Sequence, residues 1–147
     1  MHQTIKDKAA VVGVGATDYH RRGRSLPATA MDLAVEASRA ALADAGLSPR
    51  DVDGFALYAG GLNTGLLAQQ LGVPDVGFTA TLPGGGGGSA GCLGLAAGAI
   101  TSGQATVVLS VMALQQATYR LGQAGGTGSP YAFTPTPESD FALPFGW

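Results

Sequence analysis

Residues 83–92 read PGGGGGSAGC and combine five consecutive glycines with the only cysteine of the 147-residue chain. A cysteine in the first turn of a helix is a candidate nucleophile, because the helix dipole lowers the pKa of its thiol. A nucleophile also needs a neighbouring base or orienting group, yet no charged residue or histidine lies between Asp75 and Arg120. A lone cysteine in an apolar helix is more often a small core residue. We therefore interpret Cys92 as core packing and Ser89 as a helix N-cap.

The glycine run has three interpretations. In the first interpretation, the glycine run is a flexible linker. Its position between a predicted strand and a predicted helix is unusual for a linker. The second, a Walker-type phosphate loop, requires a lysine after the glycines, and the last lysine of the chain is Lys8. In the third, which we favour, the run is a strand-to-helix elbow whose backbone N–H groups face a thioester or a developing oxyanion. Glycines suit this elbow because they permit close backbone approach.

Two other stretches contain residues with binding potential. VVGVGATD, residues 11–18, has the G-x-G of a dinucleotide-binding loop, but Asp18 replaces the third glycine and the next helix starts too late. We favour a tight turn there. HRRGR brings His20 together with Arg21, Arg22 and Arg24. These arginines either attract a phosphorylated ligand or form a solvated loop.

The composition excludes several classes of protein. Hydrophobic residues make up 46% of the chain and charged residues 12%, which is typical of a globular domain. A net charge of −2 gives no reason to expect nucleic acid or an anionic membrane as a partner. The single cysteine excludes an internal disulfide and a cysteine-based metal cage, so we expect no metal. The sequence begins without a signal region and contains no run long enough for a membrane span, so we predict a soluble, cytoplasmic protein.

The hydrophobic pattern predicts strands over residues 9–15, 52–59, 77–81 and 105–113. Helices are predicted over residues 27–45, with Pro27 in the first turn, over 66–71, and over 89–100. Gly46 and Gly72 are the expected C-caps. The strand 9–15 is expected to be buried on both faces, and the helix 89–100, which is apolar all round, to be buried. This alternation predicts an α/β fold with a central sheet.

The chain divides at residue 113. Residues 1–113 form the predicted α/β half-domain, and residues 114–147 form a lid or loop region rich in Gly, Pro, Thr and Gln. The last seven residues, FALPFGW, contain three aromatic side chains and no capping element. We therefore predict that the chain is a truncated N-terminal fragment.

Two long segments resemble the thiolase superfamily. They are AAVVGVGATDYHRRGRSLPATAMDLAVEASRAALADAGLSPRDVDGF, residues 9–55, and GGGGGSAGCLGLAAGAITSGQATVVLSVMA, residues 84–113. Within the superfamily, they are most similar to the sterol carrier protein or lipid-transfer branch, which is common in bacteria that degrade sterols. The resemblance implies the N-terminal half of a thiolase-like fold, with a central mixed sheet and a buried active-site helix. It also implies a CoA thioester as substrate, no further cofactor, a homodimer, and in some members a small OB-fold partner.

The register of the resemblance addresses the role of the cysteine. Thiolases place their acyl-accepting cysteine at the start of this helix, and counting back from Gly103 puts that position at Gly86. Cys92 lies six residues later, about 240° around the helix and about 9 Å along it. The usual nucleophile is thus replaced by glycine, which places the covalent route of thiolysis or condensation in doubt.

The resemblance therefore favours a retro-aldolase-type lyase over an acyltransferase, with acid and base groups in the second half of the fold. This chain would supply substrate contacts from Gly86, Gly87, Gly88 and Ser89. A non-catalytic protein that binds acyl-CoA or lipid is the alternative. In either case, we expect the 147-residue chain alone to be catalytically inactive.

Overall fold

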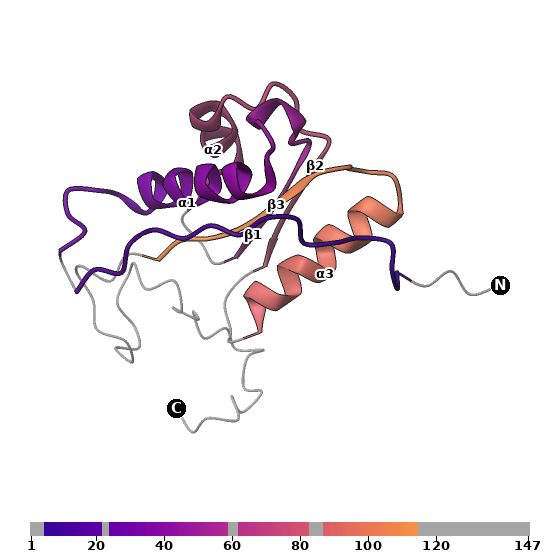
Figure 1. The fold of residues 1–147 in the computed structure, drawn as a ribbon, viewed down its shortest axis with the longest axis horizontal. Helices are drawn as coiled ribbons and strands as arrows, with labels where there is room; N and C mark the ends of the chain where they lie inside the picture. Colours follow the sequence, from indigo (N-terminus) through magenta and orange to yellow (C-terminus); the bar gives the residue numbers. More distant parts are fainter. Residues whose placement is uncertain (1–4, 22–23, 59–61, 83–86, 115–147) are drawn as a thin grey trace, which may run out of the picture.

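The computed structural model describes residues 5–21, 24–58, 62–82 and 87–114 (Figure 1). Three parallel strands form one sheet, and helices lie on both of its faces (Figure 1). The elements in chain order are α1 (Ala30–Ala45), a 3₁₀ turn (Pro49–Asp51), β1 (Gly54–Tyr58), α2 (Thr64–Leu71), β2 (Phe78–Leu82), α3 (Gly88–Thr101) and β3 (Val108–Met112). The predicted α/β class is confirmed.

The sheet has the order β2-β1-β3, so β1 is the central strand. In register, Tyr58 of β1 lies between Leu82 of β2 and Met112 of β3. All five residues of β1 are buried, as expected for a strand paired on both edges and covered on both faces. The resemblance implied a mixed sheet, whereas the strands within the described residues are all parallel.

Each face of the sheet has its own core. Phe55 and Leu57 of β1 pack with α1, α2 and the buried residues of β3 in the larger cluster. Ala56 and Tyr58 point to the opposite face, where they pack with Cys92 of α3. This division follows from the alternation of side chains along a strand. It places α1 and α2 on one side of the sheet and α3 on the other (Figure 1).

Local capping signals set the ends of the helices. The predicted start of the first helix at Pro27 is wrong, because Thr29 and Asp32 form a capping box that begins α1 at Ala30. The Thr29 side chain accepts from the Asp32 N–H at 3.2 Å, and the Asp32 carboxylate accepts from the Thr29 N–H at 2.8 Å. The predicted C-caps are confirmed: Gly46 and Gly72 have φ values of 67° and 85°, which glycine adopts without strain.

The predicted buried strand over residues 9–15 is wrong. This segment lies outside the sheet and runs along α1, where the Val14 N–H donates to Asp44 Oδ2 at 2.9 Å (Figure 1). Gly13 and Gly15 approach the α1 backbone so closely that a Cβ at either position would overlap it. Val11, Val12 and Val14 are 68%, 64% and 71% exposed. Since β2 and β3 already occupy both edges of β1, the segment has no access to the centre of the sheet.

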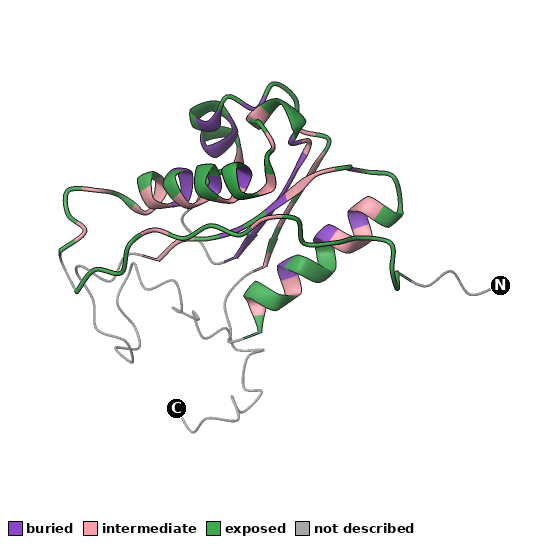
Figure 2. Cartoon of the chain, viewed as in Figure 1, coloured by how far each residue is buried: buried purple, intermediate pink, exposed green. Residues whose placement is uncertain are grey.

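The other predicted elements are confirmed with small shifts at their ends, but the expected burial of α3 on all sides is wrong. α3 buries one side, through Cys92, Ala96 and Ala99. Leu93 and Leu95, one on each flank of the buried side, are 49% and 38% exposed. Much of the α3 ribbon is coloured as exposed in Figure 2. The predicted lid over residues 114–147 lies, apart from Leu114, outside the described residues, so it stays a prediction. Among the described residues, no helix combines the length and the apolar character needed to cross a membrane.

Candidate active site

The predicted substrate contacts lie at or just before the N-terminus of α3. α3 begins at Gly88, and Gly87 is its N-cap, so the predicted N-cap role of Ser89 is wrong. The first hydrogen bond of the helix runs from the Gly91 N–H to the Gly87 carbonyl at 2.9 Å. The N–H groups of Gly88, Ser89 and Ala90 therefore precede the first bond within the helix and point out of its end. Such groups bind anionic or partly anionic oxygen.

Cys92 is a core residue in the structure, as the sequence indicated. It is the fifth residue of α3, is 1% exposed, and packs with Ala56 and Tyr58 beneath the helix. Burial raises the pKa of its thiol above the ordinary value, and a hydrogen bond from the Leu82 backbone offsets only part of this rise. The thiol is therefore protonated at neutral pH. A reactive cysteine requires the opposite shift of pKa.

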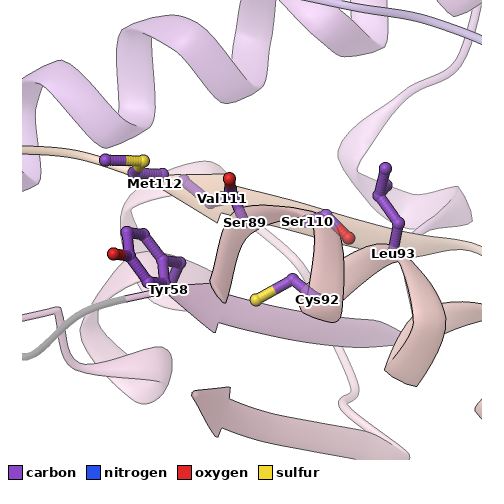
Figure 3. A pocket seen from close by; sticks show the side chains of 7 residues that line it. All are labelled: Tyr58, Ser89, Cys92, Leu93, Ser110, Val111 and Met112. Atoms are coloured by element: carbon purple, nitrogen blue, oxygen red, sulfur yellow. The ribbon is translucent and has the colours of Figure 1, made fainter. Parts of the chain in front are cut away.

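A pocket of about 220 Å³ opens between the N-terminal half of α3 and the C-terminal ends of β1 and β3 (Figure 3). Side chains from all three elements line it: Tyr58, Ser89, Cys92, Leu93, Ser110, Val111 and Met112. The carboxyl ends of parallel strands are the usual location of ligand sites in open α/β sheets. The volume of the pocket is smaller than that of sites for drug-sized ligands, which occupy about 300–1,000 Å³.

The lining of the pocket combines hydroxyl groups with apolar surface and contains no charged side chain. It suits an oxygen-bearing apolar group, and it supplies no carboxylate, amine or imidazole to act as a general base. His20, Arg21 and Arg24 do not line it, and Arg22 lies outside the described residues. Within the described residues, no group of three or more His, Cys, Asp or Glu side chains could hold a metal ion.

The structure brings together only part of the predicted site. Of the four predicted contact residues, Ser89 lines the pocket, while Gly87 and Gly88 form the adjacent end of α3. Gly86 lies outside the described residues, so its contact stays a prediction. Sequence reasoning missed Tyr58 and Ser110. Each lies at or near the C-terminal end of a predicted strand, which is the signal that could have found them.

Two curated proteins are similar to the chain across most of its length. The chain is 35% identical over 145 residues to a 17-hydroxy-3-oxo-4-pregnene-20-carboxyl-CoA lyase of Mycobacterium tuberculosis; the match covers 97% of this chain and 36% of the lyase. It is 38% identical over 122 residues to a steroid side-chain-cleaving aldolase of Thermomonospora curvata, covering 80% of this chain and 30% of the aldolase. The chain thus spans about a third of the length of these relatives. No family model matches it.

Solved structures agree with these relatives. An Ltp2-ChsH2(DUF35) aldolase is 32% identical and superposes with a TM-score of 0.68, over 78% of this chain and 29% of the aldolase chain. A monomeric SCP2-thiolase-like protein of Mycobacterium smegmatis is 26% identical with a TM-score of 0.55, over 66% of this chain and 21% of its own. The chain belongs to the thiolase superfamily. Its similarity is to the SCP2-thiolase-like branch, and the structure represents part of that fold.

Proposed function

We propose that the protein carrying this chain is a thiolase-fold lyase that cleaves a β-hydroxyacyl-CoA by a retro-aldol reaction. The observation that carries this proposal is the similarity, over 97% of the chain, to a protein named as a CoA lyase. The second relative is named as a steroid side-chain-cleaving aldolase. These names support a steroid acyl-CoA as the substrate class.

The chemistry of this reaction matches what the chain contains. A base removes the proton of the β-hydroxyl group, the bond between the α- and β-carbons breaks, and its electron pair moves into the thioester as an enolate. The β-carbon leaves as a ketone or aldehyde, and the enolate takes up a proton to give a shorter acyl-CoA. No acyl-enzyme forms, so the reaction needs no cysteine at position 86 and is compatible with the buried, protonated thiol of Cys92.

The contribution of this chain is electrostatic. The enolate oxygen gains negative charge in the transition state, and the N–H groups at the start of α3 are suited to stabilise it. We assign this contact to Gly87, Gly88 and Ser89, and we keep Gly86 as a further contact expected from the sequence. The pocket beside Ser89 would hold the apolar group next to the reacting carbons. We place the general base and acid in the rest of the thiolase fold, because no charged residue lines the pocket described here.

The assembly and surroundings of the protein are also proposals. We propose a cytoplasmic homodimer that uses CoA thioester as substrate without a further cofactor. The Ltp2-ChsH2(DUF35) aldolase supports an additional small partner protein. The SCP2-thiolase-like protein of M. smegmatis is described as monomeric. Light scattering of the full-length protein tests the proposed dimer against a monomer.

The test is product release by the full-length protein, with and without a DUF35 partner. Incubation with a 17-hydroxy steroid carrying a CoA-activated side chain is expected to release a ketone and a shorter acyl-CoA in equal amounts, measured by mass spectrometry. The control is a 3-oxoacyl-CoA with free CoA, which a lyase leaves intact. Thiolysis of this control would support the acyltransferase function instead. Binding of the hydroxyacyl-CoA without product release would support the non-catalytic acyl-CoA-binding alternative.

A further inference from the structure

The ring of Tyr58 lies directly against the first residue of α3. A Cβ built on Gly88 would overlap Tyr58 Cδ2 and Cε2 and would lie 3.2 Å from Cζ. Tyr58 is 4% exposed and packs in one cluster with Ala56 and Cys92. The start of α3 therefore approaches β1 to a distance that only glycine at position 88 permits.

In the contact between Tyr58 and Gly88, the backbone of Tyr58 is held in place by the sheet. Tyr58 ends the central strand, which is hydrogen-bonded to β2 on one edge and to β3 on the other. A second close approach differs in kind: a Cβ on Gly91 would lie 2.6 Å from Leu82 Cδ1, the far end of a flexible side chain that can move away. The Tyr58 ring moves only as a unit, by rotation about its χ1 and χ2 bonds, so a larger displacement is needed to clear a Cβ at position 88.

Neighbouring glycines show that the constraint is local. A Cβ on Gly87 or Gly94 would meet no atom of the described residues within 4 Å. The glycine content of this segment therefore does not by itself mean close packing. At Gly88 the absence of a side chain is required by Tyr58, and this position is the first residue of the helix whose N–H groups form the candidate site.

We propose that Tyr58 is a positioning residue for the proposed lyase reaction. Its ring sets, through Gly88, the depth at which the first turn of α3 lies on the sheet, and with it the position of the N–H groups that face the thioester oxygen. Tyr58 also forms one wall of the pocket next to Ser89 (Figure 3). This inference rests on the proposed function and adds a residue to that site.

The expected kinetic consequence is a loss of kcat more than a rise of KM. The contact between N–H groups and the enolate oxygen strengthens in the transition state, and interactions of this kind act on kcat. A shift of about 1 Å in such groups lowers the rate by about 100-fold. In the full-length protein, Gly88→Ala is expected to lower kcat by about this factor with KM changed by less than about threefold.

The decisive variant is the double replacement. Tyr58→Val keeps a strand-forming residue and removes the ring atoms that an alanine at position 88 would overlap. Gly88→Ala combined with Tyr58→Val is expected to recover at least about tenfold in kcat over Gly88→Ala alone, since contacting residues show non-additive effects. Tyr58→Phe keeps the ring that sets the position of the first turn of α3. Its kcat is therefore expected to be at least about tenfold above that of Tyr58→Val.

Each result supports or overturns the proposal. Parent-like kcat in Gly88→Ala, or a double variant no more active than Gly88→Ala, overturns it. If Gly88→Ala is too unstable to assay, equal kcat values in Tyr58→Phe and Tyr58→Val overturn it. A parent protein without lyase activity refutes the proposed function instead. The coupling is then measured as the unfolding midpoint in urea of the two single variants and the double variant, and additive shifts of that midpoint refute the Tyr58–Gly88 contact.

Discussion

Replacing Cys92 distinguishes a core residue from a nucleophile. The side chain is 1% exposed and packs with Ala56 and Tyr58. Cys92→Ala removes a group about the size of one methylene, so the chain is expected to lose about 1–2 kcal/mol of unfolding free energy through lost burial and a small cavity. Cys92→Ser keeps the shape of the side chain with a slightly smaller atom but places a hydroxyl group in the same apolar cluster, which is expected to cost about 1–3 kcal/mol.

Two measurements follow this replacement. Urea unfolding gives the change in stability, and product release by the full-length protein gives turnover. Because a loss of about 1–2 kcal/mol leaves a typical protein folded, Cys92→Ala is expected to lower kcat by less than about tenfold. Removal of a catalytic nucleophile lowers kcat by several orders of magnitude, about a millionfold in the best-studied case. Abolished turnover in a variant that remains folded would refute the assignment of Cys92 to the core.

The same residue predicts a dependence of stability on pH. Burial raises the pKa of the Cys92 thiol in the folded chain, so the folded state holds this proton more tightly than the unfolded state. The resulting stability is complete below the unfolded pKa of about 9.0 and is lost as pH rises through the folded pKa. Unfolding midpoints measured from pH 7 to 10 are expected to fall in the parent chain relative to Cys92→Ala. Parallel curves for the two proteins would contradict this.

Urea unfolding of the chain tests three further replacements. Thr29→Ala removes the side-chain cap of α1 and is expected to cost about 1 kcal/mol. The Thr29 N–H and, to a smaller extent, its hydroxyl lower the pKa of Asp32, and the replacement removes only the bond from the hydroxyl. The difference from the parent is therefore expected to shrink in part as pH falls below 3.8 and through the folded pKa. Ser38→Ala removes a buried hydroxyl that has no hydrogen-bond partner among the described residues, so stability is expected to stay equal or rise by up to about 1 kcal/mol. A loss of stability would mean that the hydroxyl is paired. Gly94 of α3 has open space around it, so Gly94→Ala is expected to raise stability by about 0.5–1 kcal/mol. Gly88→Ala is expected to lower stability by about 1–3 kcal/mol through overpacking. Equal effects of the two replacements would contradict the close approach of Tyr58 to Gly88.

Local signals in the sequence were sufficient for most of the elements. Gly46 and Gly72 end their helices because their backbone conformations favour glycine. The apolar run that became β1 is continuous, as a parallel strand covered on both faces requires. β3, at the edge of the sheet, buries only Leu109 and Val111 of its five residues. Pro27 misled the prediction of α1, because the capping box of Thr29 and Asp32 specifies the start of the helix more strongly than the tolerance of a first turn for proline.

The location of the candidate site was predicted in part. The glycine run indicated the N-terminal end of α3. Counting back from Gly103 in the thiolase pattern separated Cys92 from the position of the usual nucleophile. The partners of these residues were not predictable, because Tyr58 and Ser110 lie 30 and 22 positions from Gly88 in the chain. Nothing in the local pattern indicates which side chain a helix will meet on a sheet.

The order of apolar and turn-forming residues along this chain specified its fold class and its capping glycines, since these depend on neighbours within a few positions. The thiolase superfamily was indicated by the resemblance of two long segments, residues 9–55 and 84–113. The placement of residues 9–15 beside α1, the exposed side of α3 and the fit of Gly88 against Tyr58 required the folded arrangement. The physical reason is the same in all three cases. Strand pairing and helix packing join residues that are distant in sequence. The apolar character of a segment predicts that the segment will be buried, but it does not predict which other segment will cover it.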